Sequence, residues 1–459
     1  MPDDSVLDGA VPEPTLPPAT PVTMRKFGDP AATRDLLYSN TLAAARRLQP
    51  VSNTRHTLAL SDVNYEGPET FSLAKQKQAI LGGKSLSRSL RGTWTLTDNA
   101  TGQPLSTRRV TVARIPHLTD RGTFVVNGNE YSLSHQLRLR PGVFTRQQDN
   151  GDIEAHVNVQ KGLGHRIFLD PASGVFRVKF GQAEIPLLPL LRTMGVQDHQ
   201  LREAWGNDLA AVNMHKDEPQ AIGKLYKKLL GGKAIATDNL SQKAAVAKAV
   251  NDMELDPEVT ARTLGTGHTH VTADALLDTT RKLLRISRGE DEPDDRDAMA
   301  FQKVVGPEDL FAERFDKARE VARRALWKAS ARQNLDRLPP GLYDDAVSSV
   351  LMSSGLASPI EEINSAELLD QQTRITRMGE GGITSMDAVP KESRSVQPSH
   401  LGYIDTLRTP ESGKVGVDAR LARSARKGDD GRIYMPVTDA TTNQVAWKTP
   451  QDIADAPLA

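Results

Sequence analysis

Apolar and polar residues alternate over short runs in the first third of the chain, and this alternation predicts strands. These runs lie at 92–97, 107–114, 123–126 and 130–134, and helices are predicted before them near 31–48 and 71–80. Short strands are predicted again between 152 and 190, in EAHVNV, RIFLD and GVFRVKF. Residues 197–290 then place apolar side chains three and four positions apart, as amphipathic helices do. The order of these segments indicates an α+β, multidomain architecture.

The strongest helix pattern in the chain is PEDLFAERFDKAREVARRALWKASAR, residues 307–332. Acidic side chains cluster in its first turns and basic ones in its last, an order that the helix dipole favours. One apolar stripe runs along it and is expected to face a core: Leu310, Phe311, Phe315, Ala318, Ala322, Ala325, Leu326 and Ala329. The pattern predicts a single helix.

Composition narrows the classes of function. The chain has 459 residues, enough for two to four domains. Its 58 basic and 58 acidic side chains cancel, which argues against a protein covered by one sign of charge but allows a local basic groove. The lack of cysteine excludes disulfides, thiolate zinc sites and cysteine nucleophiles. No apolar run is long enough to span a bilayer, and residues 1–23 predict a disordered, proline-rich acidic tail.

Two groups of candidate metal ligands have unfavourable spacing. His268 and His270 are two positions apart without a neighbouring carboxylate pair, so a structural loop is favoured over a metal site. The acidic segment EDEPDDRD, residues 290–297, contains a proline and no framing glycine. It therefore predicts a solvated linker at a domain boundary rather than a metal site.

The clearest turn signal is Asn127-Gly128, between the apolar runs 123–126 and 130–134. Both residues tolerate the positive φ that a type I′ turn requires, so a β-hairpin is predicted. Gln136, Arg138 and Arg140 follow the hairpin directly. A hairpin by itself does not require guanidinium groups at its exit, so these side chains are candidates for a further role.

The hairpin segment, IPHLTDRGTFVVNGNEYSLSHQLRLRPGVF, resembles a segment of bacterial RNA polymerase beta subunits. The resemblance is long and nearly free of gaps. The shared residues include Pro116, Thr119, Asp120, Gly122, Thr123, Phe124, Asn127, Gly128, Glu130, Ser134, Gln136, Pro141, Gly142, Val143 and Phe144. Further segments are similar in the same order: GHRIFLDPASGVFRVKFGQAEIPLLPLLRTMGV, DDRDAMAFQKVVGPEDLF, NSAELLDQQTRITRMGEGGI and VQPSHLGYIDTLRTPESGKVGV.

The resemblance covers most of residues 85–435 and implies the protrusion, lobe and fork of a beta subunit. The implied boundaries are the tail at 1–23, the protrusion at 24–148 and 298–355, and an inserted lobe at 149–297. The fork region and the start of the following domain occupy 356–459. Beta subunits of this family continue for several hundred residues more. We therefore expect a split beta subunit, as in large bacteriophages, although a natural truncation fits the sequence equally well.

The resemblance implies a subunit of a DNA-directed RNA polymerase that forms one wall of the DNA/RNA cleft. In this family the Mg²⁺ ligands are a D-x-D-x-D cluster on the beta-prime subunit, and no such spacing occurs here. The chain is therefore expected to be inactive alone. Its expected partners are a polypeptide with the C-terminal half of beta, beta-prime polypeptides, DNA template and nascent RNA, with an initiation factor as an optional addition. No membrane partner is expected, and the expected location is the cytoplasm of an infected bacterial host or the virion.

The resemblance also assigns candidate residues to nucleic-acid contacts, since Arg and Lys neutralise phosphates without reading sequence. These candidates are Arg374, Thr376, Arg377, Arg408, Pro410, Glu411 and Lys414, with Arg420, Arg423, Arg426 and Lys427 as further basic residues. Gly379, Gly381 and Gly382 are expected to shape a tight fork loop. Gln136 and Arg138 have two alternatives: they contact nucleic acid, or they hydrogen-bond the fork.

Several positions depart from the family pattern. The family's HKRR reads QQTR in this chain, Gln371 to Arg374, and its ETPEG reads RTPES, Arg408 to Ser412. By the resemblance, Arg374 and Thr376 fall on positions that line the nascent RNA path, which is also the rifampicin pocket of bacterial enzymes. Pro410, Glu411 and Lys414 fall on positions close to the RNA 3′ end. We therefore expect a polymerase containing this chain to resist rifampicin, and inhibition of its transcription at ordinary bacterial concentrations of the drug would contradict this.

A second hypothesis is a non-enzymatic protein, either a DNA clamp or a virion component, that keeps the beta fold without catalysis. The segments RITRMGEGG and TPE favour the polymerase, because a purely structural descendant has no need of cleft-wall residues.

Overall fold

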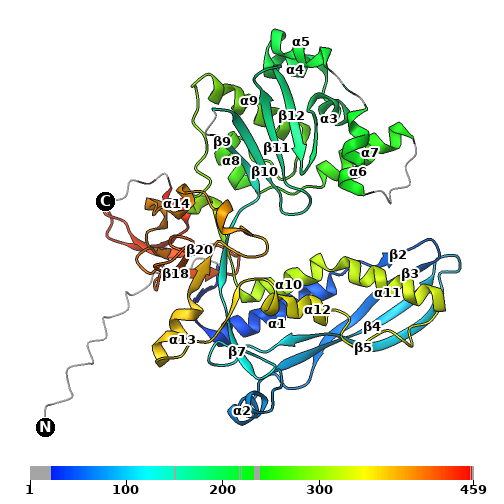
Figure 1. Cartoon of the computed structure of the whole chain (residues 1–459), viewed down its shortest axis with the longest axis vertical. Helices are drawn as coiled ribbons and strands as arrows, with labels where there is room; N and C mark the ends of the chain where they lie inside the picture. The colour runs from blue at the N-terminus through cyan, green and yellow to red at the C-terminus, as the bar shows by residue number, and fades with distance from the viewer. Residues whose placement is uncertain are drawn as a thin grey trace. The chain divides into compact units, whose positions relative to one another are not determined.

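The computed structural model describes residues 22–148, 151–216, 218, 220–231, 238–454 and 456. It divides into two compact units, one of Met1–Arg138 with Lys303–Ala459 and one of Leu139–Gln302 (Figure 1). The second unit is thus inserted into the sequence of the first, and the predicted α+β class is confirmed. The names protrusion, lobe and fork stay predictions. All but two residues of the predicted tail at 1–23 lie outside the described residues.

The first unit is built on a long antiparallel sheet of four strands in the order β2-β3-β4-β5. Alternate residues of β4 are buried, among them Leu90, Trp94 and Leu96, so one face of the strand supplies the core. Its bounds are β2 (Val51–Ser52), β3 (His56–Glu66), β4 (Ser87–Asp98) and β5 (Pro104–Pro116). The strands predicted at 92–97 and 107–114 lie inside β4 and β5.

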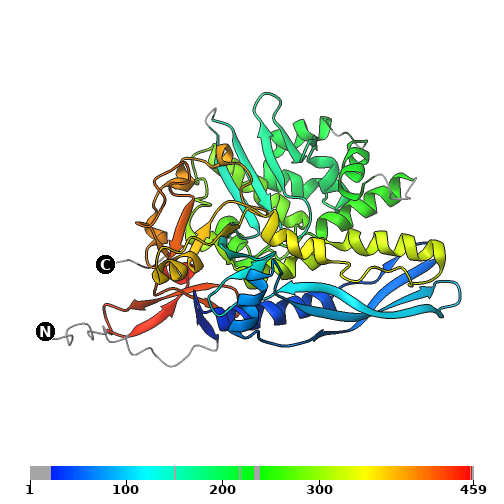
Figure 2. The ribbon, with the colours of Figure 1, turned by 60° about the horizontal axis from the view of Figure 1, so that its bottom comes forward.

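Helices complete the core of the first unit, and Figure 2 shows them along the long sheet. The predicted helices near 31–48 and 71–80 are confirmed as α1 (Pro30–Arg46) and α2 (Leu73–Leu81). The single helix predicted at 307–332 is wrong, because the chain breaks at Ala318 into α10 (Pro307–Lys317) and α11 (Arg319–Arg332). The two halves pack on different partners, α10 on α1 and α12 (Asp344–Met352), and α11 on β2, β3 and β4. The bend allows each half to bury its own apolar face.

The predicted hairpin is confirmed by β6 (Phe124–Val126) and β7 (Asn129–Leu133). Its turn residues Asn127 and Gly128 have φ of 49° and 81°, the positive values of a type I′ turn. Strand β15 (Ala357–Pro359) pairs with the other edge of β7, which ties the hairpin to the C-terminal part of the chain.

Two small sheets organise the C-terminal part of the first unit. One has the order β14-β8-β16-β18-β17, and the other β1-β19-β20-β21. The bounds of the first are β14 (Gln302–Val305), β8 (His135–Leu139), β16 (Arg374–Thr376), β18 (Asp418–Leu421) and β17 (Ile404–Asp405). Those of the second are β1 (Met24–Lys26), β19 (Arg426–Gly428), β20 (Ile433–Thr438) and β21 (Val445–Lys448). Helices α13 (Ser365–Gln372) and α14 (Pro450–Ile453) and three 3₁₀ turns, Met386–Ala388, Glu392–Arg394 and Pro398–His400, lie around them.

The second unit combines an antiparallel meander with helices. Its strands are β9 (Gly142–Gln147), β10 (Ile153–Asn158), β11 (His165–Asp170), β12 (Val175–Phe180) and β13 (Ala183–Pro186). Its helices are α3 (Leu188–Thr193), α4 (Asp198–Trp205), α5 (Asn207–His215), α6 (Ala221–Leu230), α7 (Asn239–Asn251), α8 (Pro257–Leu264) and α9 (Ala273–Ser287), with a 3₁₀ turn at Met299–Phe301. Sheet and helices share one buried apolar cluster, so this unit has its own core.

Among the residues that the structure describes, no helix has the length and apolar character needed to cross a membrane.

Candidate nucleic-acid interface

The pairing of β8 with β16 joins the two candidate regions of the sequence. The strands run parallel, and Gln136 lies opposite Thr376 in the register. On its other edge β16 pairs antiparallel with β18, where Thr376 lies opposite Asp418 and Arg374 opposite Arg420. The hairpin exit and the candidate loops therefore belong to one sheet. The side chains around β16 form the site described below.

Asp418 is the acidic centre of this sheet and is almost fully buried. Its carboxylate accepts hydrogen bonds from Thr376 Oγ1 at 2.5 Å and from Arg374 Nη2 at 2.9 Å. Lys414 Nζ lies 3.5 Å from the same carboxylate. Burial acts to raise the pKa of Asp418, but the hydrogen bonds from Thr376 and Arg374 outweigh it and the pKa is lowered. Asp418 is therefore held as an anion.

The partners of Asp418 include two residues predicted to line an RNA path. Thr376 is buried, and Arg374 is partly exposed with its guanidinium turned to Asp418 and, at 3.4 Å, to Ser358 Oγ. Their contacts within the chain fix the β16–β18 junction. A contact of either residue with nucleic acid stays a prediction.

The glycine-rich loop at 379–382 turns sharply beside the end of β16. Gly379 and Gly381 have φ of +102° and +90°, which residues with a Cβ rarely adopt. A Cβ on Gly381 would lie 2.7 Å from Cζ of Arg138, and one on Gly382 would lie 2.6 Å from the carbonyl oxygen of Arg377. Glycine at these positions therefore allows close packing of the loop on β8 and β16.

Gln136 and Arg138 hold this loop from β8. Gln136 is fully buried and donates from Nε2 to the Met378 carbonyl at 2.7 Å, while its Oε1 accepts from Arg138 Nε at 2.5 Å. Arg138 also donates to the Glu380 carbonyl at 3.2 Å and pairs with Glu313 at 2.6 Å. Of the two alternatives for these residues, the structure shows hydrogen bonds to the glycine-rich loop that was predicted to belong to the fork. Contact with nucleic acid stays untested.

An ion pair holds the outer side of the loop. The Arg314 guanidinium lies 2.6 Å from the Glu380 carboxylate, and its hydrogen bond lowers the pKa of that carboxyl. Arg377, at the start of the loop, is buried, with Nη2 3.4 Å from His400 Nε2. The loop is thus fastened on both sides.

The exposed candidates lie on a second loop, residues 407–416. Thr409 anchors it, because its hydroxyl donates to the Asp418 carbonyl and accepts from the Gly416 N–H, both at 2.9 Å. Glu411 and Lys414 are exposed and Pro410 is half-buried. Arg408 has 61% of its side chain exposed, with Nη1 2.8 Å from Asp370 Oδ1. The loop therefore presents cations to solvent on a fixed base.

The basic residues after β18 have different environments. Arg420 pairs with Asp370 at 2.7 Å, and Arg423 is exposed. Arg426 donates to the carbonyls of residues 423–425 and lies over the Trp447 ring. Lys427 is buried between Glu308 at 2.7 Å and Asp309 at 2.5 Å. The prediction of Lys427 as a phosphate contact is wrong, because this lysine is a structural cation.

A small cavity of about 140 Å³ lies beside β16 and collects several of these residues. Its lining includes Thr376, Arg377, His400, Thr409 and Val417. The cavity combines apolar walls with two guanidinium groups, of Arg377 and Arg394, and the imidazole of His400.

Comparisons with known proteins agree with this geometry. Residues 359–426 match the family model described as RNA polymerase Rpb2, domain 3. The DNA-directed RNA polymerase subunit beta of Syntrophomonas wolfei is 23% identical over 421 residues, with 86% of this chain and 37% of that relative covered. These matches support a part of an RNA polymerase beta subunit. The matched residues 359–426 include β16, both loops and β18.

Other beta subunits match to a similar extent. That of Dehalococcoides mccartyi, strain BAV1, is 24% identical over 363 residues, covering 70% of this chain and 28% of the relative. That of Corynebacterium glutamicum, strain R, is 23% identical over 466 residues, covering 92% of this chain and 39% of the relative. The chain therefore spans between 28% and 39% of the length of these beta subunits.

The acidic segments of the chain do not form a metal centre in the described ranges, where no group of three His, Asp or Glu side chains could hold a metal ion. The segment EDEPDDRD was predicted to be a solvated linker, and this prediction is wrong at Asp294. The Asp294 carboxylate contacts Lys282 Nζ and Thr145 Oγ1, both at 2.6 Å, inside the second unit. The segment also lies within that unit, which extends to Gln302. His268 pairs with Asp278 at 2.9 Å.

The sequence reasoning did not identify the acids that order the basic loops. Asp418 and Asp370 each contact at least two of the predicted cations. Asp418 follows its partner Lys414 by four residues, and a carboxylate at that spacing was an available signal. Asp370 lies far along the chain from its partners Arg408 and Arg420, so no local spacing indicated those contacts.

Proposed function

We propose that this chain forms one wall of the DNA/RNA cleft of a DNA-directed RNA polymerase. One observation carries the proposal: parallel pairing of β8 with β16 joins the hairpin exit to the segment 359–426 that matches Rpb2 domain 3. The cations of the anchored loop, Arg408 and Lys414, are the side chains in a position to meet phosphates.

In this proposal the chain contributes positioning and charge rather than chemistry. Phosphoryl transfer relies on metal ions and on an aligned nucleotide and RNA end, which beta-prime and the remaining part of beta are proposed to supply. The described residues offer no acidic cluster for Mg²⁺, so no chemical step is assigned to this chain. Its fixed loops hold the nucleic acid, and ion pairs with Asp418 and Asp370 keep Lys414 and Arg408 in place.

The remaining part of beta is proposed to reside on a second polypeptide, as the sequence resemblance implies. The complex is proposed to act in the cytoplasm of an infected bacterial host. Reading frames next to the gene are then expected to encode the rest of beta and a beta-prime polypeptide with the acidic motif.

The test is extension of a primer RNA on a DNA scaffold by the complex of all these polypeptides. The informative variant is Arg408→Ala with Lys414→Ala, and Lys77→Ala, an exposed lysine on α2, is the matched control. The double variant should bind the scaffold more weakly, and the slope of log affinity against log salt should fall by about one per lost phosphate contact. The Lys77→Ala control should keep the scaffold affinity and the salt slope of the unaltered complex.

Two results decide against the proposal. Absence of RNA product from the complete complex would favour the non-enzymatic hypothesis, which the comparisons do not favour. An active complex whose salt slope is unchanged in the double variant would remove the loop from the nucleic-acid path.

A further inference from the structure

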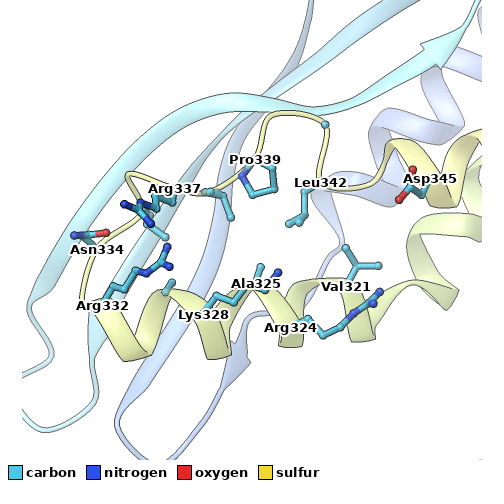
Figure 3. A pocket seen from close by; sticks show the side chains of 14 residues that line it. Val321, Arg324, Ala325, Lys328, Arg332, Asn334, Arg337, Pro339, Leu342 and Asp345 are labelled. Atoms are coloured by element: carbon cyan, nitrogen blue, oxygen red, sulfur yellow. The ribbon is translucent and has the colours of Figure 1, made fainter.

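A second cavity, of about 350 Å³, lies between α11 and the loop that leads to α12 (Figure 3). Its floor is apolar and comes from both elements: Ala325 and Ala329 from the helix, and Leu335 and Leu338 from the loop, all buried. Pro339 and Leu342 face the helix from the loop. The volume falls in the range of pockets that receive a ligand or an anchoring side chain.

Hydrogen bonds to β5 hold the loop side of this groove in place. Arg108 Nη1 donates to the carbonyls of Leu335, Asp336 and Leu338 at 2.9, 2.5 and 3.0 Å. The Gly341 N–H donates to the Thr111 carbonyl at 2.7 Å. The groove is thus formed before any ligand arrives, which lowers the entropic cost of binding.

Four cations surround the apolar floor. Arg324, Lys328 and Arg332 follow each other at intervals of one helical turn on α11, and Arg337 faces them from the loop. Within the described ranges, none of the four has an ion pair or a side-chain hydrogen bond. One acid, Asp345, lines the cavity at the start of α12. The groove therefore carries an uncompensated positive potential.

We infer that this groove is a docking site for an acidic segment of a partner protein that carries a large apolar side chain. The apolar side chain fills the cavity, and carboxylates on either side of it meet the four cations. The apolar floor favours a peptide over nucleic acid, because phosphates need cations but no apolar cavity.

The experiment measures fluorescence anisotropy of a short labelled peptide with a Leu-Phe pair flanked by Glu and Asp, added to the full chain. A second peptide replaces Leu-Phe by Ser-Ser. The protein variant is Arg324→Glu with Lys328→Glu, on the exposed side of α11. Its matched control is Arg323→Glu, on the same helix but outside the cavity, where Arg323 contacts Glu320. A single-stranded oligothymidylate is added as a competitor, because nucleic acid is the alternative class of ligand.

The Leu-Phe peptide should bind at least about tenfold more tightly than the Ser-Ser peptide, because only the first buries apolar surface. The double variant should lose at least about tenfold in affinity, and Arg323→Glu less than about twofold. Equal binding of both peptides, or no binding of the Leu-Phe peptide, overturns the proposal. So does displacement of the peptide by the oligothymidylate, or a dimer of the chain that the double variant abolishes. None of these readouts depends on RNA synthesis.

Discussion

His165 is a fully buried histidine whose ring stacks on Phe180, with 4.3 Å between ring centroids. Its Nε2 has no hydrogen-bond partner among the described residues. Burial lowers the pKa of His165 to about 4, because the charged imidazolium would lose its hydration. The ring is thus neutral in the folded protein at neutral pH.

We expect the buried His165 to make the free energy of unfolding decrease in acid. The folded pKa lies below the unfolded value of 6.5, so the unfolded chain takes up the proton first as pH falls. The contribution to stability is complete above pH 6.5 and is lost progressively down to about pH 4. His165→Phe keeps an aromatic ring on Phe180 and removes the titration, so the free energy of unfolding should depend on pH with a slope smaller by about one proton. Urea unfolding of the full chain and of the variant at several pH values between 4 and 6.5 measures this slope.

Burial also lowers the pKa values of His117 and His135 to about 4, so the variant should keep a residual slope. Identical slopes for the variant and the unaltered chain would show that His165 does not titrate between the folded and unfolded states.

At the scale of elements, a buried charge cluster joins β19 to α10. Lys427 of β19 contacts Glu308 and Asp309 of α10, and Arg25 of β1 also pairs with Glu308. Burial acts against the charge of Glu308, but the nearby Lys427 and Arg25 outweigh it and lower its pKa. The three elements are therefore held together by an ion cluster whose central pair, Lys427 and Glu308, is almost fully buried.

Removing the lysine should be costly because it leaves carboxylates without their partner. Lys427→Met is expected to lower the free energy of unfolding by about 3 kcal/mol or more. Arg423→Met, an exposed cation just before β19, should change it by less than about 0.5 kcal/mol. Denaturant unfolding of both variants gives the comparison, and a difference within error would mean that water replaces the lysine.

The elements also show what the sequence can and cannot predict. The hairpin at Asn127 and Gly128 and two strands of the long sheet, β4 and β5, were predicted, because alternation and turn chemistry are local. The other two strands of that sheet, β2 and β3, were not predicted. The break at Ala318 was missed because it depends on which elements α10 and α11 pack against. The burial of Lys427 depends on a partner 119 residues away. Likewise the pairing of β8 with β16, which assembles the candidate site, joins segments far apart in the sequence and was not predicted.

At the scale of the whole molecule, the inserted unit Leu139–Gln302 has a sheet of its own and a separate apolar core. Trp205 lies in that core, where its indole N–H donates to Thr280 Oγ1 at 2.8 Å. Residues 139–302 expressed alone should therefore fold, and should unfold in one cooperative transition seen by Trp205 fluorescence. A non-cooperative transition, or an emission maximum typical of exposed tryptophan, would show that this core needs the rest of the chain.

The pairing of β1 with β19 sets an order of events during synthesis. Met24 lies opposite Gly428 in the register, so about 400 residues must leave the ribosome before the first strand meets its neighbour. At roughly 5–20 residues per second this takes on the order of 20–80 s. Among the described strands, the first to be translated is thus paired only after β19 has been made, and its edge is without that partner until then.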